Sequence, residues 1–162
     1  CGTLFPYTTL FRSGDGSLNM TIHELATCRR YGIGVKVVVI NNQWLGMVRQ
    51  WQDMIYDGHR AGSGLADPMA VKAEGEADIY PDFPTIAAGY RVRAERVTHP
   101  DALDGALERL LADPDEPFLL DVIVAAEENV YPMIPAGGSY QEIIMGPDDL
   151  QPGAREQQGS NI

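Results

Sequence analysis

Short, almost unbroken apolar runs alternate along the chain with stretches in which apolar residues recur every three or four positions. The runs Val35–Ile40 and Phe118–Val124 are typical of strands buried on both faces, and Arg91–Val97 is a third strand candidate. The helical spacing predicts helices at Thr21–Tyr31, Phe83–Ala88 and Asp101–Leu111. Because strands and helices alternate, the pattern predicts an α/β fold with a mainly parallel sheet and flanking helices.

The first predicted helix has recognisable end signals. Thr21 and Glu24 form a capping-box pattern at its start, and Gly32 is placed to end it. The strand Val35–Ile40 follows, and Asn41 and Asn42 come directly after it. These two amides should therefore lie at the carboxyl end of the sheet, where open α/β sheets bind ligands.

The remaining segments carry weaker patterns. Residues 53–82 are rich in Gly and Pro and are predicted to form a long loop with at most one short helix. Residues 129–145 are predicted to be extended, and the polar residues 151–162 to be a flexible, disordered tail. Residues 14–150 are therefore expected to form one domain.

The first 13 residues are expected to lie outside the fold. Thr3–Ser13 reads TLFPYTTLFRS, which is the translation of a DNA adapter used widely in sequencing. The alternative is a natural strand, which the aromatic and β-branched residues would suit. We interpret residues 1–13 as an adapter artefact and leave them out of the functional reasoning.

Composition narrows the classes of partner. The chain has 162 residues with a net charge of −11, which argues against nucleic acid, because phosphate backbones require clustered Lys and Arg. One small phosphorylated ligand remains compatible with this charge. The two cysteines, Cys1 and Cys28, make no disulfide framework and favour a reducing cytoplasm. No apolar run has the length of a membrane span, and no secretory signal is evident.

Two short motifs suggest metal and phosphate chemistry. Asp15, within GDGS, offers a carboxylate, Asn42 offers an amide oxygen, and the Trp44 carbonyl follows two residues later. Mg²⁺ prefers such oxygen ligands and usually shares them with substrate phosphates. The flanking glycines, Gly14 and Gly16, allow close backbone approach to a phosphate, and Ser17 can donate a hydrogen bond. GDG and NN are also common turn sequences, and on spacing alone the turn and the ligand site remain open.

Longer motifs extend the pattern. The run from GDGSLNMTIHELATCRRYG to VVVINNQWLGMVRQWQ resembles the C-terminal cofactor domain of the acetolactate synthase (acetohydroxyacid synthase) family, and PFLLDVIV and VYPMIPAGGSYQEII continue the likeness. The resemblance covers about residues 14–147. GDG and NN are shared by all thiamine-diphosphate enzymes, whereas LGMVRQWQ and VYPMIPAGG favour the synthase. A thiamine-diphosphate-binding fold, truncated at its N-terminus, is therefore expected.

The resemblance implies an activity and its cofactors. Members of the family are transferases that act in branched-chain amino acid biosynthesis. They decarboxylate pyruvate on thiamine diphosphate and join the remaining two-carbon unit to a second 2-keto acid, either pyruvate or 2-ketobutyrate. Mg²⁺ and, in the full-length enzyme, FAD are implied as cofactors. A homodimer or dimer of dimers and a regulatory small subunit are the implied partners. The activating glutamate of the family lies in a separate domain, so the chain alone is expected to be inactive.

The resemblance also assigns roles to residues. It implies that Asp15, Asn42 and the Trp44 carbonyl bind the metal, and that Trp51 and Ala136 lie along the substrate channel, where Ala136 replaces a frequent Ser. The implied cofactor-binding set is Gly14, Asp15, Gly16, Ser17, Asn42, Trp44, Leu45, Gly46 and Met47.

Other functions remain open alternatives. Within the same chemistry they are glyoxylate carboligase, pyruvate oxidase and a 2-keto acid decarboxylase. A non-catalytic module that binds a diphosphate is an alternative from a different class. A general Rossmann-like nucleotide binder is weakened because no G-x-G-x-x-G follows a first strand.

Overall fold

A computed structural model describes residues 9–65, 79–135 and 137–150 and shows one parallel sheet in this part of the chain. The order across the sheet is β1-β2-β4-β3, and every neighbouring pair is parallel. The strands are β1 (Leu10–Gly14), β2 (Lys36–Asn41), β3 (Arg93–Val97) and β4 (Phe118–Ile123). The predicted parallel α/β architecture is confirmed.

The two central strands carry a core on each face of the sheet. On one face, Val37, Val39 and Leu119 pack with side chains of the flanking helices. On the other face, Phe118 and Leu120 belong to a second cluster. Alternate residues of one strand point to opposite faces, so a nearly unbroken apolar run is what two covered faces require.

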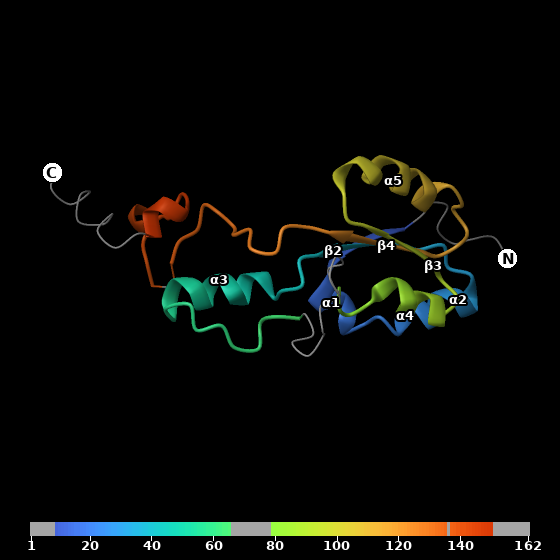
Figure 1. Ribbon diagram of the computed structural model, residues 1–162, viewed down its shortest axis with the longest axis horizontal. Helices are drawn as coiled ribbons and strands as arrows, with labels where there is room; N and C mark the ends of the chain where they lie inside the picture. The colour runs from blue at the N-terminus through green and yellow to red at the C-terminus, as the bar shows by residue number, and fades with distance from the viewer. Residues whose placement is uncertain (1–8, 66–78, 136, 151–162) are drawn as a thin grey trace, which may run out of the picture.

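Helices cover both faces (Figure 1). One face holds α1, α2 and α4, whose buried Leu18, Leu25, Phe83 and Ala87 complete the first cluster. The other face holds α5, which buries Ala106 and Leu110 in the second. The bounds are α1 (Asp15–Asn19), α2 (Glu24–Tyr31), α4 (Phe83–Gly89), α5 (Leu103–Leu111) and the 3-10 turn η1 (Pro100–Ala102).

One further helix, α3 (Gly46–Ile55), lies beyond the carboxyl ends of the strands (Figure 1). The chain that leaves β4 runs away from the sheet beside α3 and includes the 3-10 turns η2 (Tyr140–Glu142) and η3 (Pro147–Leu150). We call residues 126–135 and 137–146, which lie beside α3, the arm. Residues 129–135 and 137–145 were predicted to be extended. They are irregular and contain η2, and Met133 and Ile144 form an isolated antiparallel bridge.

Two predicted local features were wrong. The first long helix begins at Glu24 rather than Thr21, its N-cap is His23, and no side chain caps it, so the Thr21 capping box does not form. It does end at Gly32, which has a φ of 62°. Helix α3 was not predicted at all, because residues 41–52 were interpreted only as a motif.

The N-terminal segment also differs from expectation. Leu10–Gly14 pair with β2 along their whole length, so the residues of β1 that precede Gly14 belong to the fold. Leu10 and Phe11 remain 61% and 46% exposed, and β1 is therefore held by backbone pairing more than by core contacts. Residues 1–8 and the predicted tail 151–162 lie outside the described residues, and the adapter origin stays a prediction.

Within the described ranges, no helix combines the length and the apolar character that crossing a bilayer would require.

Candidate diphosphate and metal site

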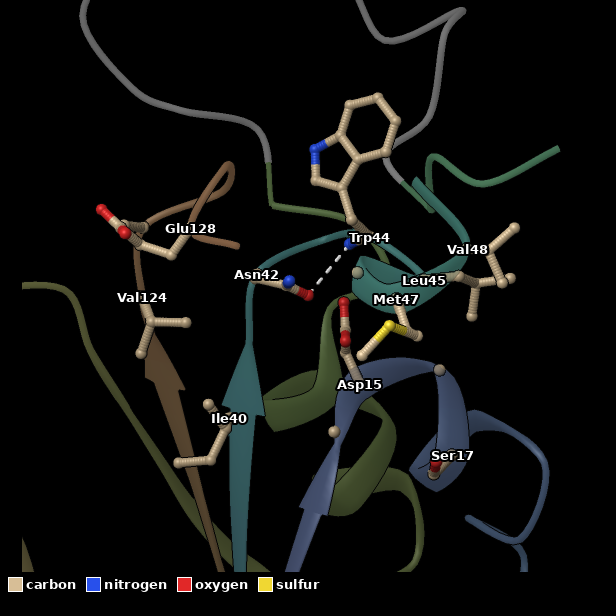
Figure 2. A pocket seen from close by; sticks show the side chains of 14 residues that line it. Asp15, Ser17, Ile40, Asn42, Trp44, Leu45, Met47, Val48, Val124 and Glu128 are labelled. Carbon is tan, nitrogen blue, oxygen red and sulfur yellow. Dashed lines mark hydrogen bonds between the residues drawn. The ribbon is translucent and has the colours of Figure 1, made fainter. Parts of the chain in front are cut away.

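Three parallel strands end at the same edge of the sheet and bring distant residues together there. Asp15 follows β1 directly, Asn42 follows β2, and Val124 follows β4. Figure 2 shows these three strand ends surrounding one open pocket. This is the edge at which an open parallel sheet binds ligands.

The pocket has a volume of about 480 Å³. Its walls come from the GDGS turn, the ends of β2 and β4, and the start of α3. The lining residues are Gly14, Asp15, Gly16, Ser17, Ile40, Asn42, Trp44, Leu45, Gly46, Met47, Val48, Val124, Ala125 and Glu128. All nine residues predicted from the sequence to surround the cofactor are therefore in one pocket.

The Asp15 side chain is the most unusual group in this pocket. The residue is 3% exposed, and its Oδ2 atom is buried without a hydrogen-bond partner. Burial raises the pKa of Asp15 above its ordinary value, and the negative charge of Asp121 adds to this rise. Backbone hydrogen bonds, including one from Gln43, act in the opposite direction. An unpaired buried carboxylate oxygen is costly and is a natural ligand for a hard cation.

The turn after β2 presents the amide of Asn42. Its Oδ1 accepts a hydrogen bond from the Trp44 backbone N–H at 3.2 Å, and a carbonyl oxygen can accept a second partner. Gln43, between them, has a φ of 59°, a conformation that non-glycine residues seldom adopt. Two backbone hydrogen bonds, from Leu45 to Ser63 and from Leu65 to Gln43, hold the turn against the following loop.

Two glycines allow the backbone segments around the pocket to approach closely. A Cβ at Gly16 would lie 2.7 Å from Cδ2 of Leu45, and a Cβ at Gly46 would lie 3.0 Å from Nδ2 of Asn42. Helix α3 starts at Gly46, and no side chain caps its N-terminus. Its first backbone N–H groups, which carry partial positive charge, therefore border the pocket.

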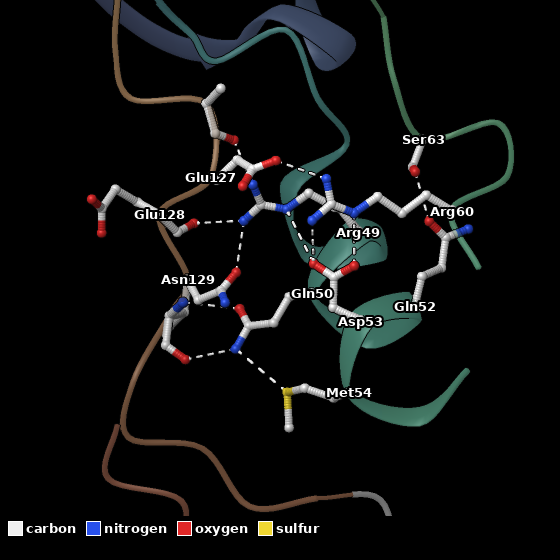
Figure 3. A network of polar contacts seen from close by, with 12 residues as sticks. Arg49, Gln50, Gln52, Asp53, Met54, Arg60, Ser63, Glu127, Glu128 and Asn129 are labelled. Carbon is white, nitrogen blue, oxygen red and sulfur yellow. Dashed lines mark hydrogen bonds and ion pairs between the residues drawn. The ribbon is translucent and has the colours of Figure 1, made fainter. Parts of the chain in front are cut away.

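The arm is attached to α3 by polar contacts (Figure 3). Arg49 is fully buried and donates hydrogen bonds to the carbonyl of Ala126 at 2.6 Å, the carbonyl of Glu128 at 3.1 Å and Oδ1 of Asn129 at 2.6 Å. Gln50 exchanges two 2.9 Å hydrogen bonds with the Val130 backbone. These bonds fix the segment that places Glu128 at the pocket.

Two guanidinium groups lie close to the Trp44 ring. Arg60 lies 5.2 Å and Arg49 lies 6.0 Å from the ring centroid, within the range of cation–π attraction. Arg60 also pairs with Asp53 and Glu127, each at 2.7 Å. Trp44 therefore connects the pocket to the arm.

Of the two predicted channel residues, the structure describes Trp51. It is half-buried on α3 and does not line the pocket. Ala136 lies outside the described residues. Sequence reasoning missed five lining residues. They could have been found from their positions, which lie at or after the end of a strand or in the first turn of α3. These residues are Ile40, Val48, Val124, Ala125 and Glu128.

The donors available for a metal are mixed in type. In the described ranges, no group of three or more His, Cys, Asp or Glu side chains is arranged to hold an ion. Asp15 and the amide of Asn42 provide a partial oxygen set, which fits Mg²⁺ completed by phosphate oxygens and water better than an all-protein metal cage.

The sheet, the carboxylate–amide pair and the glycine-rich approach to one pocket define a cofactor domain that binds a diphosphate at its strand ends. A family model described as thiamine pyrophosphate enzyme, C-terminal TPP binding domain, matches residues 8–122. The chain belongs to this family.

Curated relatives and a solved structure agree with this assignment. The chain is 48% identical over 135 residues to probable acetolactate synthase 2 of Oryza sativa subsp. japonica and 46% identical to acetolactate synthase 1 of Zea mays, both chloroplastic. Each match covers 83% of this chain and 20% of the relative, so the chain spans a fifth of their length. A thiamine diphosphate-dependent 4-hydroxybenzoylformate decarboxylase of Rhodococcus jostii RHA1 matches 75% of this chain and 20% of its own, with a TM-score of 0.62 and 26% identity.

Proposed function

We propose that the pocket binds thiamine diphosphate through a Mg²⁺ ion held by Asp15, Asn42 and the Trp44 carbonyl. The buried, unpartnered Oδ2 atom of Asp15 carries this proposal. The charge of the pocket supports it, because the lining residues include two carboxylates and no Lys or Arg. A diphosphate, which is itself an anion, needs a cation to bridge it to such a wall.

The same site suggests a role for the remaining lining residues. Gly14 and Gly16 leave room for the diphosphate, Ser17 is exposed and available as a hydrogen-bond donor, and the α3 N-terminus provides further N–H groups. The apolar side chains of Leu45 and Met47 would contact the uncharged part of the cofactor. This chain therefore binds and orients the diphosphate end.

The reaction we propose is that of an acetolactate synthase. One pyruvate loses carbon dioxide, and the remaining two-carbon unit forms a carbon–carbon bond to the keto carbon of a second 2-keto acid, giving acetolactate or acetohydroxybutyrate. Bound thiamine diphosphate would supply the electron sink for decarboxylation, which amino-acid side chains alone do not provide. The identity to plant acetolactate synthases supports this reaction.

The whole enzyme requires more than this chain. We propose that an activating glutamate, an FAD site and the dimer contacts belong to the parts of the relatives that this chain does not match. Mg²⁺ and thiamine diphosphate are the cofactors assigned to the residues described here.

A second candidate reaction is simple decarboxylation of a 2-keto acid. The likeness to the 4-hydroxybenzoylformate decarboxylase favours it. The two reactions differ in their products, since a decarboxylase releases an aldehyde and a synthase releases a hydroxy-keto acid. Product analysis of a full-length enzyme carrying this segment separates them.

Calorimetric titration of the chain with thiamine diphosphate tests the binding site. We expect binding that requires Mg²⁺ and that weakens at least about tenfold in Asp15→Asn and Asn42→Ala, since even outer-shell changes at metal sites cost about 10–100-fold. The matched control is Asp104→Asn, at an exposed carboxylate on α5, which should bind like the wild type. Unchanged binding by Asp15→Asn would refute the metal site.

A further inference from the structure

A buried carboxylate in β4 joins two side chains across the sheet. Asp121 is fully buried. Its Oδ2 atom accepts a hydrogen bond from Nε of Arg96 at 2.8 Å, and its Oδ1 atom accepts one from Nδ2 of Asn41 at 3.0 Å. Arg96 also donates to Asp82 at 2.9 Å, at the N-cap of α4. The bonds therefore run from α4 through β3 and β4 to the end of β2.

The line of hydrogen bonds continues to the pocket. Oδ1 of Asn41 accepts a hydrogen bond from the Gln43 backbone N–H at 3.1 Å. Gln43 is the residue with the positive φ. On either side of Gln43 are Asn42 and Trp44, two of the proposed metal ligands.

Asp121 sets the orientation of the Asn41 amide, and with it the direction of the hydrogen bonds that this amide makes. A carboxylate only accepts hydrogen bonds, so the Asn41 amide must turn its NH₂ group toward Asp121. Its oxygen then faces the Gln43 N–H. An amide that was free to flip would place a donor against this N–H in half of its orientations, and the unusual Gln43 conformation would lose its support.

Core packing alone does not explain Asp121. Its neighbours Leu119 and Leu120 are both fully buried and apolar, and a buried ion pair is often replaceable by apolar residues at no loss of stability. The carboxylate occurs where β4 lies beside the last residues of β2, since Asp121 is in register with Val39.

We propose that Asp121, held by Arg96, is a positioning residue that fixes the Asn41 amide and so sets the turn that carries Asn42 and Trp44. It does not contact the pocket itself, because it is absent from the lining residues. This inference rests on the proposed function only for its effect on cofactor binding. The effect on the turn is independent of any ligand.

Amide hydrogen exchange at Gln43 in the cofactor-free chain tests the role, using a swap of the two side chains. Asp121→Asn leaves an NH₂ group facing a donor, either Asn41 or Arg96, because an amide cannot accept from both. Asn41→Asp places two carboxylates face to face. Each single variant should speed exchange at Gln43 about tenfold, as expected for one lost hydrogen bond. The double variant restores a donor at 121 and an acceptor at 41, and its exchange should return close to the wild-type rate.

A second, less disruptive variant tests the proposal if the Asp121 variants do not fold. Arg96 is on the edge strand β3, and its side chain is 23% exposed, so Arg96→Gln is better tolerated than a change at Asp121. It should speed exchange at Gln43 several-fold, whereas Arg109→Gln, which removes an exposed pair with Glu95, should not. Wild-type exchange at Gln43 in the folded single variants, or no recovery in the double variant, would overturn the proposal.

The second part of the test is thiamine diphosphate binding by the same variants in the presence of Mg²⁺. Binding should weaken in the folded single variants and recover in the double variant. A role limited to stability would leave binding by the folded single variants unchanged. If the wild-type chain bound no thiamine diphosphate, the proposed function would fail, while the exchange rates would still decide the positioning role.

Discussion

At the scale of single residues, Asp15 shows how a binding site opposes stability. A carboxylate that is buried without a full set of partners disfavours its own ionised form, and this is the state of Asp15 when no cation is bound. A bound divalent cation would reverse the preference, because an adjacent positive charge favours ionisation. The folded chain thus has a carboxylate whose environment is suited to the bound state.

This arrangement predicts that Asp15→Asn stabilises the chain in metal-free buffer at neutral pH. The folded-state pKa of Asp15 is raised, so between the unfolded and folded pKa values the folded chain binds more protons than the unfolded chain. The free energy of unfolding therefore falls as pH rises through this window and stays lower above it. Thermal unfolding should show a higher midpoint for Asp15→Asn, with about 2–4 °C for each kcal/mol in a chain of this size.

The control for this comparison is again Asp104→Asn, which should follow the wild-type pH profile. Equal midpoints for Asp15→Asn and wild type at neutral pH, or the same fall in stability with pH, would show that the Asp15 carboxylate is not destabilising.

Local sequence was enough to predict some site residues and not others. Asn42 directly follows a strand that the sequence predicts, so its place at the sheet edge could be predicted from the residues before it. Asp15 was recognised only from its GDGS motif and spacing, because the strand before it, β1, was expected to lie outside the fold. Glu128 reaches the pocket, and Asp121 reaches Asn41, only because β4 inserts between β2 and β3. That order depends on packing between segments distant in sequence, which no local pattern encodes.

At the scale of elements, strands and α3 illustrate opposite cases. Val35–Ile40 and Phe118–Val124 were predicted to within one residue of β2 and β4 at either end, because burial on both faces leaves an apolar run that a single polar residue interrupts, Lys36 in one and Asp121 in the other. Apolar residues recur at helical spacing through α3, as Val48, Trp51 and Ile55 do, and this spacing could have predicted a helix. The buried side chains, however, are Arg49 and Gln50, whereas Met47 and Val48 are exposed. The side of α3 that is buried could therefore not be predicted from the apolar pattern.

The polar attachment of α3 predicts the effect of Arg49→Met. This variant removes three hydrogen bonds to residues 126–129, and bonds to a charged group contribute about 1.5–3 kcal/mol each. We expect amide exchange and protease cleavage at residues 126–133 to become at least about tenfold faster, with the sheet unaffected. The matched control is Arg60→Met, since Arg60 makes exposed ion pairs that contribute little.

If Arg49→Met left residues 126–133 as protected as Arg60→Met does, the arm would be held by contacts other than the Arg49 bonds.

At the scale of the whole molecule, the pocket is open and the chain spans a fifth of its relatives. We expect the chain, supplied with thiamine diphosphate, Mg²⁺, FAD and pyruvate, to form no acetolactate. The reason is that the family resemblance places the activating glutamate in a separate domain. A colorimetric assay for acetolactate checks this expectation.

Acetolactate formation by the chain alone would contradict the expectation. In that event Glu128→Gln would show whether the second carboxylate of the pocket replaces the glutamate of the separate domain.

The location of both tryptophans outside the core of the sheet has a practical consequence. The sequence contains two tryptophans, Trp44 at the pocket and Trp51 on α3, and neither belongs to the two core clusters of the sheet. Light absorbed selectively by indole is therefore emitted from the pocket and from α3 alone. Fluorescence would follow ligand entry and arm detachment, whereas far-ultraviolet circular dichroism would follow the sheet and its helices, so two optical signals could separate the two regions without any label.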